Sequence, residues 1–421
     1  MRLPHTRNLV GAIVIILLLI AAGLVIAQDQ ETLRIRTSLA VSDPRFPDYL
    51  ATLLGDPLTA GDTYIVHTNG DSAFPAMLAA IDAAKHRVTF ETYIFAPGQV
   101  AERFVTAFEG AARRGVSCQL VLDSVGASDM DERHIERLTN AGCRIGWFNV
   151  ISSFSIEEAN YRTHRKALVV DGDVGFIGGI GIADQWLVEA EDSPKWRDTH
   201  FEVRGPAAIN VEAAFHENWI ETGGVVEPDL LLHSKPGGKA QSIVVWSSPE
   251  GGANELKLMY LLAIAAARKT LDIQSPYLIT DESTQWSLAE ARKRGVRIRM
   301  LTEGDLTDAK PVKFAGRADY ERLMEQGIEV YEYQPAMMHT KAVMVDGAMA
   351  IIGSANFDNR SLELNDELNA AVFDPALAER LGADFEDDLR RSKKLTLDEW
   401  RSRPLHIRAR EQMWGFFGEV F

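Results

Sequence analysis

Two short segments of the chain carry the same polar side chains at the same spacing. HRKALVVDG (residues 164–172) and HTKAVMVDG (residues 339–347) each set a histidine, a lysine and an aspartate around one apolar run. An imidazole can attack phosphorus or move a proton near neutral pH. A lysine ammonium can hold the non-bridging oxygens of a phosphate group. The repeated segment therefore predicts chemistry on a phosphate ester.

Two histidines suit a displacement that passes through a covalent intermediate. One attacks phosphorus while the other protonates the leaving alkoxide, and they exchange these duties when the acceptor arrives. We therefore predict a site built from two pairs, His164 with Lys166 and His339 with Lys341. No metal is expected, because the histidines, cysteines and aspartates show no ligand spacing and the lysines would occupy the place of a cation. No other cofactor is required.

The geometry of a strand must position each pair. His164 and Lys166 occupy alternate positions before a short apolar strand at 167–170, so their side chains should project from the same face. A turn at Asp171 should return a second apolar run to Gly179. Small residues at the end of that run would let the backbone approach a bound anion. The second copy ends in the same way, in Gly353, Ser354 and Asn356.

The duplication extends over most of the chain. Three further pairs of segments match in the same order, namely 87–97 with 270–280, 111–123 with 290–303, and 138–148 with 323–333. A similar order with slightly drifting offsets indicates a duplicated domain. Each half alternates strands with helices, which predicts an α/β fold of two similar lobes, each a mostly parallel sheet flanked by helices. The Gly- and Pro-rich stretch 221–241 is expected to separate a lobe at 29–228 from a lobe at 229–421.

The N-terminal residues predict a membrane segment. The run from Leu9 to Ala27 is uncharged, mostly apolar and long enough to cross a bilayer as a helix. Basic residues precede it and Asp29 follows it, so the N-terminus should face the cytoplasm and the body should lie across the membrane. We expect residues 1–28 to form a single-pass transmembrane helix. A signal peptide, cleaved before secretion of the body, is the alternative.

Composition limits the partners of the body. The chain has 44 Lys and Arg against 60 Asp and Glu, a formal net charge of −16. Such a surface repels polyanions, so nucleic acid is not an expected partner. Cys118 and Cys143 are too few for a disulfide scaffold, and two buried thiols are expected, with a single bridge as the alternative. The aromatic stretch 411–421 should pack onto the body, with membrane contact as the alternative.

Further motifs complete a family pattern. They are ETYIF (91–95), FIGG (176–179), WRDTHFEVRGP (196–206), SPYLIT (275–280) and IIGSANFDNRSLELNDELN (351–369). Together with the twin segments, they make the chain resemble the phospholipase D superfamily, and within it the bacterial cardiolipin synthase-like proteins. The resemblance runs from about residue 60 to the end of the chain.

The resemblance implies a role for each polar residue of the twin segments. His164 would attack phosphorus and become a phosphohistidine, and His339 would protonate the leaving alcohol. Lys166, Lys341 and Asn356 would hold the phosphoryl oxygens. The resemblance also places an acidic residue from the opposite lobe behind each histidine. The expected partners are Glu367 for His164 and Asp198 for His339, where a carboxylate would fix the tautomer of the imidazole.

The remaining motif residues have supporting roles in this resemblance. Asp171 and Asp346 complete the repeated catalytic motif, although they are expected to anchor loops rather than to touch the substrate. Gly179 and Ser354 should lie near the phosphate. In one place the chain departs from the family pattern, because Gly181 stands where an asparagine is frequent. One phosphate donor of the first copy is therefore missing, and Asn356 would serve both copies.

The function that the resemblance implies is a membrane-anchored phosphatidyltransferase that makes cardiolipin with phosphatidylglycerol as acceptor. Its location would be the bacterial inner membrane, with the body in the periplasm. A phospholipase D that gives the intermediate to water is the alternative, and a membrane-anchored or secreted nuclease of the same superfamily is another. The expected partners are phospholipids and the membrane. Because both histidines lie in one chain, no protein partner is needed and a monomer is expected.

Overall fold

A computed structural model gives the structure of the protein. It describes residues 32–416 and Gly418, with gaps at 151–160, 189–194, 227–233 and 249–254. No helix within these described residues is long and apolar enough to cross a membrane. The apolar run at 9–27 lies outside them, so its interpretation as an anchor or a signal peptide stays a prediction.

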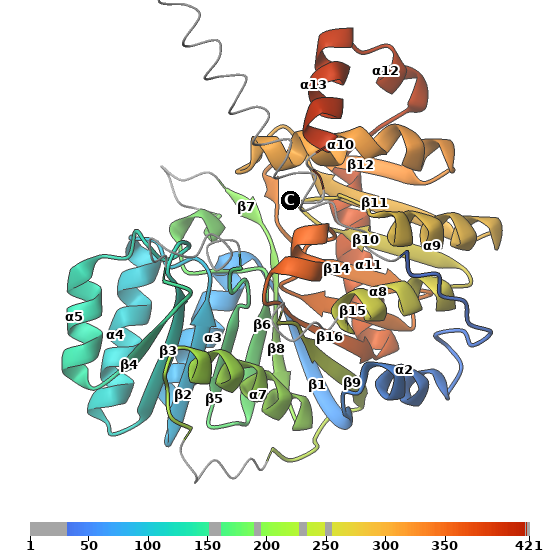
Figure 1. Cartoon of the computed structure of the whole chain (residues 1–421). Coiled ribbons are helices and arrows are strands. Elements are labelled where there is room, and N and C mark those ends of the chain that lie inside the picture. The colour runs from blue at the N-terminus through green and yellow to red at the C-terminus, as the bar shows by residue number, and fades with distance from the viewer. Residues whose placement is uncertain are drawn as a thin grey trace, which may run out of the picture.

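Fifteen strands form one sheet, in the order β17-β12-β11-β10-β14-β15-β16-β9-β1-β8-β6-β5-β2-β3-β4 (Figure 1). The strands of one half are β1 (Leu58–Thr68), β2 (Arg87–Thr92), β3 (Ser117–Asp123), β4 (Arg144–Phe148), β5 (Ala167–Val170), β6 (Val174–Gly178) and β8 (Thr199–Arg204). Those of the other half are β9 (Ala240–Trp246), β10 (Thr270–Gln274), β11 (Arg297–Glu303), β12 (Glu329–Tyr333), β14 (Ala342–Val345), β15 (Met349–Gly353) and β16 (Leu368–Phe373). Apart from the edge strand β17 (Ser392–Lys394), the order read outward from β1 mirrors the order read outward from β9.

The strand directions correct the prediction of mostly parallel sheets. Only β2-β3-β4 and β10-β11-β12 are parallel within the described sheet, and all other neighbouring strands in it are antiparallel. The reason lies in the twin segments, because each turns back at its Asp-Gly pair into an antiparallel hairpin, β5-β6 and β14-β15. The sheet is therefore mixed, and it runs without interruption from one half into the other.

Helices cover both faces of this sheet (Figure 1). Their bounds are α2 (Phe46–Leu54), α3 (Asn69–Ala83), α4 (Gln99–Arg113), α5 (Glu132–Ala141), α7 (Pro206–Glu221), α8 (Glu255–Ala266), α9 (Glu282–Lys293), α10 (Lys310–Glu325), α11 (Pro375–Arg390), α12 (Leu397–Arg401) and α13 (Leu405–Gly415), with the short turns η1 (Asp184–Trp186) and η3 (Arg360–Leu364). One core cluster lies between the helices α3 and α4 and the strands of the first half. Another lies between the helices α8 and α9 and the strands of the second half. A third joins α7 and α11 with strands of both halves, so the two halves share a core.

The segment before β1 packs on the second half. Phe46, Leu50 and Leu54 of α2 belong to the same core cluster as α8 and α9. The backbone N–H of Leu33 also donates to Ser283 at 2.9 Å. The described part of the chain therefore begins on the second half and crosses into the first at β1.

Two glycines occupy matching positions just after the ends of α4 and α9. Gly115 follows α4 with φ +89°, and Gly295 follows α9 with φ +90°. A residue with a side chain is strained in this left-handed conformation, whereas glycine adopts it freely. Each of these helices therefore ends two residues before its glycine, which turns the chain toward β3 or β11.

At the C-terminal end, α12 and α13 stand together beyond α10 (Figure 1). Glu411 of α13 is buried and binds Arg317 of α10 at 2.9 Å. The C-terminal stretch thus packs onto the body as predicted, at least as far as Phe416. Met413 and Phe416 remain 55% and 63% exposed. Cys118 and Cys143 are both free and buried.

Candidate active site

Each histidine of the twin segments lies just before the first strand of a hairpin. His164 precedes β5, which lies between β2 and β6, and His339 precedes β14 between β10 and β15. All four residues of β5 and of β14 are buried. Such apolar strands fix their register through packing on both faces. The polar residues that precede these inner strands are thereby held at the ends of the strands.

The backbone joins each histidine to the opposite half. The N–H of His164 donates to the carbonyl of Asp366 at 2.8 Å, and the N–H of His339 donates to the carbonyl of Arg197 at 2.7 Å. Around His339 this contact extends into a small parallel sheet of β7 (Trp196–Arg197) with β13 (Met337–Met338). Each histidine therefore lies beside the residue that precedes an acidic residue of the other half.

Next to these backbone contacts, the side chains form two imidazole–carboxylate pairs, each between a histidine of one half and a carboxylate of the other. Nδ1 of His164 lies 2.7 Å from Oε1 of Glu367, and Nδ1 of His339 lies 2.7 Å from Oδ2 of Asp198. Both carboxylates are completely buried. The structure thus brings together the four residues that the family resemblance paired across the two halves.

The charges of these pairs decide which nitrogen of each ring carries the proton. Burial alone would raise the pKa of Glu367, but His164 and Lys166 outweigh it and the pKa is lowered. The pKa of Asp198 is lowered against its burial in the same way, chiefly by His339. An ionised carboxylate only accepts hydrogen bonds. Nδ1 of each histidine must therefore donate, which leaves a lone pair on Nε2 of a neutral ring.

Each lysine is held next to its own histidine. Lys166 donates to the carbonyl of His164 at 2.7 Å, and Lys341 donates to the carbonyl of His339 at 2.6 Å. Both lysine residues are only 2% exposed. Lys166 also lies 5.7 Å from the ring centre of Tyr93, a cation–π distance. The two ammonium groups are thus fixed rather than free in solvent.

Burial lowers the pKa values of these four basic groups, and repulsion from a neighbouring lysine adds to the effect at His164, Lys166 and His339. Burial, together with the positive charge of the two lysines, lowers the pKa of His164 to about 4 and that of His339 to about 3. Burial likewise lowers the pKa of Lys166 to about 7 and that of Lys341 to about 8. The two lysines disfavour positive charge on both histidines, and Lys341 disfavours it on Lys166. An anion bound among them would relieve this strain and favour their protonated forms.

The residues after each hairpin contact the two buried carboxylates. Ser354 donates to Oε2 of Glu367 at 2.5 Å and accepts from the N–H of Leu368 at 3.0 Å. A Cβ on Gly179, the matching position, would lie 2.4 Å from Oδ1 of Asp198. That both residues also lie near a bound phosphate stays a prediction. Gly179 gives room to one carboxylate, and Ser354 bonds to the other.

Trp186 donates a hydrogen bond to Asp198, as Ser354 does to Glu367 in the other half. Its Nε1 donates to Oδ2 of Asp198 at 2.9 Å, and its side chain is completely buried. The same ring explains Gly181, where a Cβ would come within 3.1 Å of Trp186 and Ile94. An asparagine in this place would require Trp186 or Ile94 to shift by a few tenths of an ångström. Sequence reasoning gave Trp186 no role.

The matching position of the second half holds Asn356. Asn356 is 6% exposed, and its Oδ1 has no hydrogen-bond partner within the described part of the chain. The oxygen and nitrogen of an amide exchange places by a half-turn of the group. Asn356 can therefore present a donor to a phosphoryl oxygen without breaking an existing bond.

Two further rings border the histidines. The ring of Trp196 lies 4.5 Å from that of His339, and the ring of Tyr93 lies 5.5 Å from that of His164 in an edge contact. Both residues fall within recognised sequence segments, WRDTHFEVRGP and ETYIF, but neither was given a role. Their rings limit the orientations that the imidazoles can adopt.

Asp171 and Asp346 lie at the other ends of β5 and β14 and do not join the catalytic group. Asp171 accepts hydrogen bonds from the N–H groups of residues 85–87, at 2.8–2.9 Å. Asp346 accepts the matching bonds from residues 268–270, at 2.7–2.9 Å. Both have positive φ, 53° and 54°. They anchor turns, as their expected role required, and their grouping with the catalytic residues is corrected.

No group of three or more His, Cys, Asp or Glu side chains among the described residues could hold a metal ion. The polar groups of the site are instead two neutral imidazoles, two buried ammonium groups and an amide. This set can attack a phosphorus atom, move one proton and bind phosphoryl oxygens.

Fold and site together define a member of the phospholipase D superfamily. The chain belongs to the family described as cardiolipin synthase, PLD-like domain, whose model matches residues 77–193 and 260–389. It is 34% identical to cardiolipin synthase 2 of Bacillus anthracis over 349 residues, 82% of this chain and 68% of the relative. It is 30% identical to cardiolipin synthase of Geobacillus kaustophilus over 365 residues, 85% of this chain and 72% of the relative.

Solved structures share the fold at low sequence identity. The crystal structure of phosphatidylserine synthase from Haemophilus influenzae matches 89% of this chain and all of its own, with a TM-score of 0.69 and 13% identity. Polyphosphate kinase from Porphyromonas gingivalis matches 88% of this chain and 53% of its own, with a TM-score of 0.54 and 14% identity. At these identities the likeness concerns the fold alone.

Proposed function

We propose that the protein is a phosphatidyltransferase that makes cardiolipin from phosphatidylglycerol. The crossed pairs His164–Glu367 and His339–Asp198, each at 2.7 Å, carry this proposal. They provide two neutral imidazoles with free Nε2 atoms beside two ammonium groups. Membership of the cardiolipin synthase family supports the same activity, and the names of the relatives give the substrate class.

The first half-reaction transfers the phosphatidyl group to the protein. Nε2 of His164 attacks phosphorus, the bond from phosphorus to the glycerol oxygen breaks, and His339 gives its proton to that oxygen. His164 is the better nucleophile because its side chain is 14% exposed, against 6% for His339. Lys166 and Lys341 hold the phosphoryl oxygens.

In the second half-reaction the acceptor hydroxyl takes the phosphatidyl group. His339 accepts the hydroxyl proton, the acceptor oxygen attacks phosphorus, and the bond from phosphorus to Nε2 of His164 breaks. Water in place of the acceptor would give phosphatidic acid. The anionic diester raises the pKa of His339 from its low value, so that the ring can carry the proton that it donates.

The chain organisation follows from the duplicated sheet. We assign one lobe to residues 29–228 and the other to 229–421, with the segment before β1 packed on the second lobe. Residues 1–28 would anchor the body on the periplasmic side of the membrane that contains its substrates. A monomer suffices, because one chain supplies both histidines and both carboxylates.

Lipid mass spectrometry tests this proposal on the full chain in vesicles that contain phosphatidylglycerol. The wild type should form cardiolipin and release glycerol, and His164→Ala should form neither. His86→Ala is a matched control, because His86 is exposed and far along the chain from either carboxylate pair. Phosphatidic acid without cardiolipin would show that the protein is a hydrolase and not a transferase. No lipid product at all would contradict both activities.

A further inference from the structure

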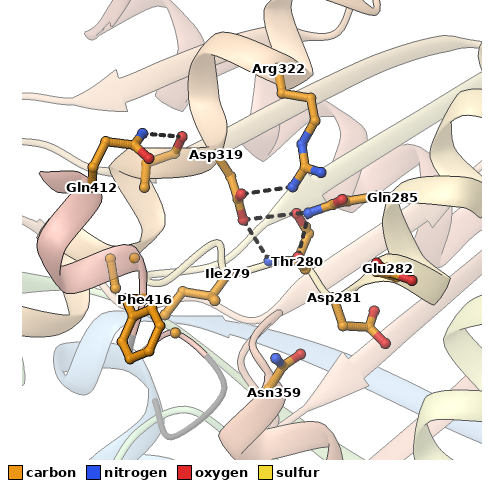
Figure 2. A pocket seen from close by; sticks show the side chains of 14 residues that line it. Ile279, Thr280, Asp281, Glu282, Gln285, Asp319, Arg322, Asn359, Gln412 and Phe416 are labelled. Atoms are coloured by element: carbon orange, nitrogen blue, oxygen red, sulfur yellow. Dashed lines mark hydrogen bonds and ion pairs between the residues drawn. The ribbon is translucent and has the colours of Figure 1, made fainter. Parts of the chain in front are cut away.

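A cavity of about 550 Å³ lies on the second half, between the loop that follows β10, the helix α10 and the end of α13 (Figure 2). Its size is in the range of cavities that bind small organic molecules. Ile279 and Phe416 give it an apolar side. Thr280, Gln285 and Asn359 give it a polar side (Figure 2). None of these residues takes part in the carboxylate–histidine pairs.

Asn359 is the feature of this cavity that calls for a ligand. The residue is only 4% exposed and lines the cavity, and its amide is not among the fully buried polar atoms that lack a partner, so it is accessible from the cavity. Figure 2 shows the amide directed into the space below Ile279 and Asp281. An amide on the wall of a cavity forms its hydrogen bonds with the solvent or the ligand that fills the cavity. The group can both donate and accept hydrogen bonds.

The other polar groups of the cavity indicate an uncharged ligand. Asp319 accepts hydrogen bonds from Thr280 at 3.1 Å and from Arg322 at 3.0 Å. Asp281 forms an ion pair with Lys257 at 2.7 Å. Arg322 is the only basic side chain among the described lining residues, and it is already paired. A phosphate would therefore meet acidic groups and no free cation, whereas hydroxyl groups could donate to the carboxylates and accept from the amide.

The cavity adjoins the phosphate-binding part of the site through one short loop. Asn359 follows Asn356 by three residues, so their Cα atoms lie within roughly 11 Å of each other. The N–H of Ile279 donates to the carbonyl of Phe357 at 3.1 Å, which ties the cavity wall to the same loop. The cavity and the residue that we expect to hold the phosphoryl group therefore share one loop.

We propose that this cavity binds the uncharged polyhydroxyl group of the acceptor, of glycerol or sugar type. The inference rests on the proposed transferase activity and adds the place where the acceptor is recognised. Asn359 and Gln285 form hydrogen bonds with the hydroxyl groups, and the side formed by Ile279 and Phe416 contacts the carbon chain. The phosphate group of the donor lipid binds between the two histidines, so the donor does not use the cavity.

The test compares acceptors that do and do not require the cavity. Full-length protein is given phosphatidylglycerol vesicles as donor together with deuterated glycerol, sorbitol or ethanol, and each phosphatidyl product is measured by mass spectrometry. Asn359→Leu should raise the half-saturating concentration of both polyols about tenfold, the effect of losing one or two hydrogen bonds. Transfer to ethanol, which is too small to use the cavity, should stay unchanged. Cardiolipin formation in the same samples shows whether a lipid-borne glycerol uses the same place.

A second variant separates recognition from folding. Ala318→Phe fills the cavity from α10 and should weaken polyol transfer as Asn359→Leu does, again with ethanol unaffected. Equal losses with ethanol and polyols, or no loss with either, would overturn the acceptor site. A wild type that forms no phosphatidyl product with any acceptor would instead contradict the proposed function itself.

Discussion

Nδ1 of His164 lies 2.7 Å from Oε1 of Glu367, which stands 203 residues further along the chain. The carboxylate is completely buried, and its other oxygen accepts a 2.5 Å hydrogen bond from Ser354. It therefore cannot turn away from the imidazole. The proposed nucleophile in one half thus depends on the other half for its tautomer and its orientation.

Glu367→Gln tests this dependence. The amide can offer its NH₂ group to Nδ1, which would place the ring proton on Nε2 and remove the nucleophilic lone pair. We expect kcat for cardiolipin formation to fall by about 10²–10⁴, the range of one positioned proton-transfer group. The pH dependence of kcat should shift as well, which a purely structural role would not cause. Glu379→Gln, on the exposed side of α11, should leave kcat unchanged.

Trp186→Phe should weaken the second carboxylate pair. The substitution keeps an aromatic ring but removes the N–H that donates to Asp198 at 2.9 Å. A lost hydrogen bond to a buried charge costs about 1.5–3 kcal/mol. Urea unfolding followed by circular dichroism should show a decrease of this size, together with a lower kcat. An unchanged free energy of unfolding would mean that Asp198 does not depend on the indole.

Gly179→Ala should displace the same carboxylate by contact. The added Cβ would lie 2.4 Å from Oδ1 of Asp198, so one of the two groups must move. Overpacking of this kind costs about 1–3 kcal/mol. Gly382→Ala is the matched control, because a Cβ there meets nothing within 4 Å. It should raise the free energy of unfolding by about 0.5–1 kcal/mol, since Gly382 lies within a helix.

Anion binding should draw protons into the site. Burial lowers the pKa of Lys166 to about 7 and that of Lys341 to about 8, so at pH 8 both are partly neutral. A bound oxyanion favours the charged form, which raises both pKa values and takes protons from solution. Titration calorimetry with tungstate at pH 8, in buffers of different ionisation enthalpy, should therefore report net proton uptake.

A lysine substitution gives this experiment its control. Lys166→Met should reduce the proton uptake, whereas Lys269→Met, at an exposed position, should not. Proton release by the wild type, or equal uptake by both variants, would show that the two buried lysines do not receive the anion.

The four polar groups of the site could be predicted because they are local and repeated. The spacing of His164 and Lys166 before an apolar strand recurs at His339, and this recurrence singles out the residues without any knowledge of their contacts. The carboxylate partners came from family resemblance and not from spacing. No local pattern connects Glu367 with a histidine that precedes it by 203 residues.

The parts that escaped prediction depend on contacts between distant segments. Alternation of strands and helices suggested parallel sheets, but the turns at Asp171 and Asp346 fold each twin segment into an antiparallel hairpin. The role of Trp186 depends on the path of the chain after Gly181, which brings the indole under Asp198. Periodicity and composition contain no information on either arrangement.

The most direct test of the account is the position of the covalent intermediate. Wild-type protein mixed with phosphatidylglycerol vesicles is quenched within one turnover at alkaline pH, where phosphohistidine survives, and its peptides are analysed by mass spectrometry. The account predicts a phosphatidyl adduct on the peptide that contains His164. An adduct on His339 alone, or cardiolipin formed with no adduct on either histidine, would contradict it.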